Sequence, residues 1–177
     1  MVPTVCRGAS ARHDLRGNRC GDLRAAESDS AAGRRRGTIT EEDAMADTLT
    51  DEQWRGLMPL AKHLRLELME ASPERVVARV RHAPELCTAG GILHGGTIMA
   101  LADSAGAVAA FLNLREGAGT STTSSNTVFL RGVAGGTVTA TARPLHVGRR
   151  TIAVVVELVD DDGRPVAQVT QSQAVLT

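Results

Sequence analysis

Residues 90–112 read GGILHGGTIMALADSAGAVAAFL and carry the features that decide the fold. From Thr97 to Leu112 the residues are apolar or small on every face of a helix, except at Asp103 and Ser104. A helix that is apolar all round is buried all round. We therefore expect one long helix over about 95–113, covered by a sheet that wraps it or by a second subunit.

The sequence around this helix is strand-like. A short helix is expected over about 51–58, because Thr50 offers an N-cap, acidic residues follow it, and Pro59 ends it. Two strands at 63–70 and 74–82 are expected to form a hairpin that turns at Ser72-Pro73. Four Val- and Thr-rich strands are then expected at 121–131, 137–147, 150–159 and 165–176. Antiparallel strands with one helix inserted early predict an α+β fold.

The composition argues against a nucleic-acid partner and a membrane span. Lys+Arg and Asp+Glu are both 20, and the aromatic residues are only Trp54, Phe111 and Phe129, with no Tyr. The chain therefore has neither the basic charge nor the stacking residues of a nucleic-acid binder. The apolar helix is expected to be too short to cross a membrane, and it carries a carboxylate at its middle. The N-terminus lacks the apolar stretch of a signal peptide.

The metal-ligating residue types are scattered. Cys6, Cys20 and Cys87 form no CxxC pair, and none of the five histidines has a chelating partner four residues away. We therefore expect no metal site, no disulfide framework and a cytoplasmic location.

The first 44 residues differ from the rest in composition. They are rich in Arg, Asp, Gly, Ala and Ser and include the run Arg34–Arg36, which we interpret as a solvated charge run. Such a stretch buries too little apolar surface to offset its ordering entropy. We expect a disordered, dispensable extension over 1–44 and a domain over 45–177 that starts at Met45.

Asp103 is the first candidate for chemistry. A carboxylate on a buried helix costs several kcal/mol unless it is paired or lies in a polar cavity. Two structural roles are open, capping a neighbouring segment or pairing with a buried Arg. We favour the third interpretation, a carboxylate that acts at a site.

The glycines at the start of the same helix are the second candidate. The segment from Gly90 to Thr97 leaves backbone N–H groups free at the positive end of the helix dipole, where they can polarise a carbonyl. Nine residues separate His94 from Asp103, about 13 Å along the helix axis. Both groups can act on one substrate only if they come from different protomers, which predicts a two-fold dimer with composite sites.

These motifs resemble the hotdog-fold acyl-CoA thioesterases, in particular the phenylacetic-acid-degradation (PaaI-like) branch. The resemblance covers the chain from about residue 47. The stretches that carry it are Gly91–Gly96, Asn126–Arg131, Gly148–Arg150 and Asp162–Ala167. The position of Asp103, nine residues after His94, is also part of it. It implies a sheet wrapped around the long helix, homodimers joined edge to edge, and dimers that pair into tetramers.

The resemblance also implies roles for single residues. Asp103 would be the nucleophile or the general base for hydrolysis of an aryl- or medium-chain acyl-CoA. The N–H of Gly96 (or Gly95) from the partner chain would bind the thioester oxygen. His94 would order the turn and the substrate, and Ser121 would orient water.

The sequence departs from the family at one position. Relatives usually carry Asn three residues before the first glycine of the motif, where this chain has Thr88. A hydroxyl makes a hydrogen bond there but lacks the paired donor and acceptor of an amide.

Arginines are the candidates for the CoA phosphates. Arg149 and Arg150 in a hairpin rank first, ahead of Arg131 and Arg143. CoA enters as part of the substrate, and no separate cofactor is expected. Two other functions stay open: a hotdog hydratase or dehydratase, which would use His94 and Asp103 in proton transfer, and a non-catalytic acyl-CoA-binding module.

Overall fold

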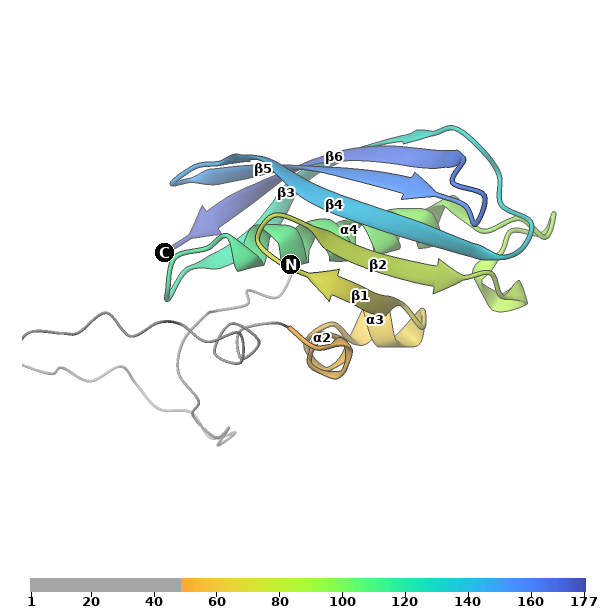
Figure 1. Ribbon diagram of the computed structural model, residues 1–177, viewed down its shortest axis with the longest axis horizontal. Coiled ribbons are helices and arrows are strands. Elements are labelled where there is room, and N and C mark those ends of the chain that lie inside the picture. The colour runs from red at the N-terminus through yellow and green to blue at the C-terminus, as the bar shows by residue number, and fades with distance from the viewer. Residues whose placement is uncertain (1–48) are drawn as a thin grey trace, which may run out of the picture. The chain divides into compact units, whose positions relative to one another are not determined.

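The computed structural model describes residues 49–177, so the extension expected over 1–44 lies outside the described residues. The elements are α2 (Asp51–Leu57), α3 (Pro59–His63), β1 (Glu67–Ala71), β2 (Val76–Arg81), the 3₁₀ turn η1 (Pro84–Leu86), α4 (Gly95–Leu112), β3 (Gly119–Phe129), β4 (Thr137–Val147), β5 (Thr151–Val159) and β6 (Pro165–Leu176). The strands form one antiparallel sheet in the order β1-β2-β4-β5-β6-β3. The predicted α+β fold is confirmed, and Figure 1 shows the sheet curving over α4.

Small side chains allow α4 to lie close to the sheet. Ala102, Ala105 and Ala109 on the helix are fully buried, and the strands turn buried β-branched residues such as Val154 and Val156 toward them. Alanine keeps helix propensity high and takes little space, so the helix can approach the strands without leaving voids. This interface is the core of the domain.

One face of α4 is not covered in the single chain. The uncovered positions recur every three to four residues and are Gly96, Met99, Ala100, Asp103, Ser104 and Ala107. Met99 is 42% exposed although it is apolar. Of the two covers expected for the helix, a wrapping sheet or a second subunit, the sheet therefore supplies only part. The sheet covers one side, and an apolar stripe remains for another surface.

The length of α4 also corrects an expectation. It has 18 residues with a mean hydropathy of 1.4, which is long and apolar enough by composition to cross a membrane. Half of it is nevertheless buried inside the fold, and Asp103 lies on it. The helix packs against the strands as a core helix does. Its burial therefore argues against a membrane span, although its length does not.

Pro59 begins a helix instead of only ending one. It occupies the first turn of α3, where a missing N–H costs nothing and the fixed φ favours the helix. The predicted first strand, 63–70, therefore begins later, at Glu67. The other predicted strands lie within a few residues of the observed ones.

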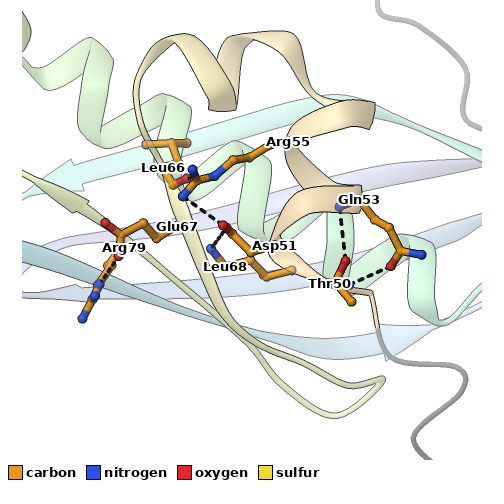
Figure 2. Close-up of polar contacts among 8 residues, drawn as sticks. All are labelled: Thr50, Asp51, Gln53, Arg55, Leu66, Glu67, Leu68 and Arg79. Atoms are coloured by element: carbon orange, nitrogen blue, oxygen red, sulfur yellow. Dashed lines mark hydrogen bonds and ion pairs between the residues drawn. The ribbon is translucent and has the colours of Figure 1, made fainter.

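Polar contacts fasten α2 to β1 (Figure 2). Asp51 Oδ1 accepts the N–H of Leu68 at 2.7 Å, and Arg55 Nε donates to the carbonyl of Leu66 at 3.1 Å. Asp51 and Arg55 are themselves paired at 2.9 Å. Thr50 and Gln53 close a capping box at the start of the helix. These contacts hold the α2–α3 segment over one edge of the sheet, and the Trp54 side chain of α2 is fully buried there.

The turn between β5 and β6 is organised by one carboxylate. Asp160 accepts hydrogen bonds from the N–H groups of Asp162 (3.1 Å) and Arg164 (2.9 Å) and from the Arg164 side chain (3.0 Å). Burial raises the pKa of Asp160, but the hydrogen bonds and the charge of Arg164 outweigh it and hold the pKa below its ordinary value. The charged form is thus favoured in the folded state.

We predict that this turn loses stability in acid. A carboxyl whose folded pKa is lowered stabilises the protein above its unfolded pKa of about 3.9, and this stabilisation is lost as the pH falls through the folded value. Unfolding of the wild type and of Asp160→Asn by denaturant, followed between about pH 2 and 6, should give a stability difference that shrinks below about pH 4. A difference that stays constant over the whole range would contradict this assignment.

Candidate functional site

The N-terminus of α4 is capped by His94. Its Nδ1 accepts the N–H of Gly96 at 2.8 Å, and its carbonyl accepts the N–H groups of Thr97 and Ile98. This capping leaves the N–H of Gly95 without a hydrogen-bond partner among residues 49–177. Of the two candidate oxyanion donors, Gly96 is thus engaged within the turn, and Gly95 is the one that is available.

The loop before the helix is held in one shape by hydrogen bonds. The N–H (2.8 Å) and the hydroxyl (3.3 Å) of Thr88 both donate to the carbonyl of Ile92. The backbone carbonyl of Thr88 accepts the N–H of Gly91 at 2.9 Å. Gly91 has a φ of 75°, a conformation that favours glycine. His82 Nε2 also lies 2.9 Å from the Gly91 carbonyl. Thr88 therefore stabilises the loop that positions the helix start.

Asp103 lies at the middle of the uncovered stripe of α4. Its Oδ1 accepts a hydrogen bond from Thr122 Oγ1 at 3.1 Å and one from Gln171 Nε2 at 3.2 Å. Within residues 49–177 it forms no ion pair, so pairing with a buried Arg is not its role there. It is an exposed carboxylate that neutral donors hold from one side.

The hydroxyl beside Asp103 belongs to Thr122 and not to Ser121. Side chains alternate along a strand, so Ser121 lies on the other face of β3 from Thr120 and Thr122. Both threonines bond to groups on the helix side of the sheet, Asp103 and Gln173. The structure thus places Thr122, and not the predicted Ser121, against the carboxylate of Asp103, and the predicted role of Ser121 in orienting water stays a prediction.

Two glutamines that were not among the predicted site residues belong to the site. Gln171 and Gln173 are 3% and 0% exposed, at positions of β6 that face the helix. The signal was available, because Val169, Gln171, Gln173 and Val175 occupy the same face of a period-two strand. Amides at core positions are costly unless they are hydrogen-bonded, so they indicate a built network.

A cavity of about 250 Å³ opens beside Asp103. Its walls are mainly apolar and come from the α2–α3 segment and from the face of α4 that runs from Ser104 to Phe111. Its polar end is formed by Asp103, Thr120, Thr122 and Gln173. A cavity with a single carboxylate at one end and apolar walls suits a substrate that joins a reactive polar group to an apolar tail.

The predicted CoA arginines do not lie together. Arg131 donates its N–H to the carbonyl of Val166, whereas the carbonyl of Arg150 accepts the N–H of Val175. Val166 and Val175 are nine residues apart on β6, about 30 Å. Arg149 and Arg150 are thus at the opposite end of the sheet from Arg131 within one chain.

Arg131 is at the same end as the start of α4. It follows Phe129, whose ring packs so closely on Gly95 that a Cβ added there would be 3.1 Å from it. Arg143, the remaining candidate, is paired with Glu157 at 3.7 Å. No group of three or more His, Cys, Asp or Glu side chains among residues 49–177 has the arrangement of a metal site.

Comparisons with known proteins agree with this architecture. Residues 90–167 match the family model of the thioesterase superfamily. Rv1847 of Mycobacterium tuberculosis, which is named as a candidate esterase, is 35% identical over 114 residues, 63% of this chain and 81% of that protein. The proofreading thioesterase EntH of Cronobacter turicensis is 29% identical over 117 residues, 66% of this chain and 85% of EntH.

Solved structures show the same fold. The structure of Rv1847 has a TM-score of 0.65 and 33% identity, covering 67% of this chain and 97% of that one. Thioesterase HI1161 of Haemophilus influenzae has a TM-score of 0.70 and 26% identity, covering 74% and 93% of the two chains. With an apolar helix inside one antiparallel sheet and a carboxylate beside a cavity, the chain belongs to the thioesterase superfamily and is a thioester hydrolase with the hotdog fold.

Proposed function

We propose that the enzyme hydrolyses an aryl- or medium-chain acyl-CoA thioester to the free acid and CoA. The observation that carries the proposal is the position of Asp103 at the polar end of a cavity whose walls are apolar. The thioester carbonyl would lie at the carboxylate and the acyl group would extend along α4 toward Phe111. A volume of about 250 Å³ is near the lower end for ligand pockets, about 300–1,000 Å³, which suits a small acyl group.

The proposed active site is composite. Gly95 and Asp103 lie on the same uninterrupted helix, about 12 Å apart along its axis. One carbonyl group cannot contact both within a protomer, so the oxyanion donor would be Gly95 of the partner subunit. Two features support a homodimer: the uncovered stripe of α4, and β3 as an edge strand with exposed Val128 and Phe129. Two such dimers would pair into a tetramer.

The chemistry follows from these two groups. The helix N-terminus polarises the carbonyl and stabilises the negative charge that develops on its oxygen. Asp103 either attacks the carbonyl carbon itself or takes a proton from the attacking water. In both routes the C–S bond breaks, CoA leaves as the thiolate and the thiolate takes up a proton. In the first route the acyl group is left on Asp103 as a mixed anhydride, and water then hydrolyses this anhydride to release the free acid and restore the carboxylate. Arg131 lies at the end of the sheet where α4 begins, and it is the first candidate for a contact with a CoA phosphate.

We predict that Asp103→Asn lowers turnover by about 100-fold or more, the usual contribution of a positioned base. Release of free thiol should be measured with phenylacetyl-, benzoyl-, hydroxybenzoyl-, and short and medium straight-chain acyl-CoA. Glu116→Gln, the same kind of change at an exposed carboxylate outside the cavity, is the matched control and should keep full activity. Near-full turnover in Asp103→Asn would rule out this role for the carboxylate.

The walls of the cavity predict an effect on chain length. Ala107 lies one helical turn after Asp103 and lines the cavity. In Ala107→Leu the added side chain should displace about three methylenes of a medium-chain substrate, at ~0.8 kcal/mol each, and lower kcat/KM about 50-fold. Acetyl-CoA does not reach Ala107 and serves as the control in the same variant. An equal fall for both substrates would show that the acyl group lies elsewhere.

A further inference from the structure

Gln173, Gln171, Thr122 and Asp103 form a closed ring of hydrogen bonds. The amide of Gln173 donates from Nε2 to Thr122 Oγ1 at 2.9 Å and to Gln171 Oε1 at 3.2 Å. Thr122 Oγ1 and Gln171 Nε2 donate in turn to Asp103 Oδ1, at 3.1 and 3.2 Å. Both arms of the ring therefore begin at one amide group and end on one carboxylate oxygen.

The direction of this ring is fixed by the carboxylate. An ionised carboxylate only accepts hydrogen bonds, so Gln171 must turn its NH₂ toward Asp103 and its oxygen toward Gln173. Gln173 must then present its own NH₂, whose second hydrogen goes to Thr122. The single hydroxyl hydrogen of Thr122 is left for Asp103. A flip of either amide would place two oxygens against each other, so the ring has one satisfied orientation.

The two amides of the ring are buried in the core. Gln171 and Gln173 are 3% and 0% exposed, so an unsatisfied amide here would carry its full desolvation cost. Gly106 makes the space for it, because a Cβ at that position would overlap Gln171 Oε1 and lie 3.0 Å from its Cδ. A glycine inside a helix lowers helix stability relative to alanine. The close approach of Gln171 explains why the helix nevertheless has a glycine at this position.

We propose that Gln171 and Gln173 are positioning residues that hold Asp103 Oδ1 and leave Oδ2 for the reaction. No hydrogen bond from residues 49–177 reaches Oδ2. Fixing one oxygen prevents rotation of the carboxylate and aims the other, which removes an entropic cost from the chemical step. The inference rests on the proposed role of Asp103 in hydrolysis.

The test is the steady-state kinetics of Gln171→Met, which keeps the side-chain length and removes the amide. Loss of a hydrogen bond to a charged group should lower kcat about tenfold, with KM little changed because the cavity walls are untouched. Gln168→Met is the matched control, since Gln168 is on the same strand but points to the exposed face. A purely structural role would lower the thermal stability of Gln171→Met and leave the kcat of the folded enzyme unchanged.

Gly106→Ala gives an independent test that keeps both glutamines. Its Cβ displaces Gln171 Oε1 and should lower kcat with KM little changed, with the fold checked by thermal unfolding. A wild-type kcat in whichever of these variants folds would overturn the proposal, while an inactive Asp103→Asn would leave the proposed function in place. An active Asp103→Asn would overturn both.

Discussion

The close approach of α4 to β6 at Gly106 is the contact on which the site depends. It allows a buried amide to fit between helix and sheet and brings Asp103, one turn earlier, within hydrogen-bond distance of Gln171 and Thr122. Packed interiors do not deform continuously, so a larger residue at this position would separate these groups instead of stretching each bond slightly. The alanines that flank Gly106 keep the helix close to the sheet along the rest of its length.

The helix carries the two groups of the proposed site at different points along its axis. Its start is capped by a side chain that engages one glycine N–H and leaves the preceding one available, and its middle carries the carboxylate. Because a helix is rigid, the distance between the two groups is set by residue count alone. The proposed composite site across a two-fold axis would use both copies of the helix without bending either one.

Most of the fold follows from local sequence patterns. The strand positions are given by Val- and Thr-rich alternation, and the long helix by its continuous small and apolar residues, so their ranges were predictable. Asp103 was predictable because it is the one carboxylate on that helix. The partners of Asp103 were not, since they depend on which strand lies next to the helix. Ser121 and Thr122 differ only in the face of β3 that they occupy, and a bulge near Thr122 shifts the register there.

Other parts of the site depended on topology that the sequence does not show. The arginine candidates were ranked by their positions on or between the C-terminal strands, but the antiparallel sheet separates Arg131 from Arg149 and Arg150 by most of the length of β6. Pro59 permits either the end of one helix or the start of the next, and only the packing of α3 decides between them. Local sequence patterns do not determine long-range contacts of this kind, because these contacts form only when distant segments pack together.

The way α2 is fastened to β1 bears on how this enzyme can diverge. On the strand side, the contacts made by Asp51 and Arg55 use the backbone N–H of Leu68 and the backbone carbonyl of Leu66 (Figure 2). Backbone groups are present whatever side chain the strand carries, so these contacts tolerate substitution along β1. The cavity wall carried by α2 and α3 can thus change its side chains while its attachment is inherited intact. Under the proposed function, changes in this wall would alter the acyl preference and leave the hydrogen-bonded ring around Asp103 in place.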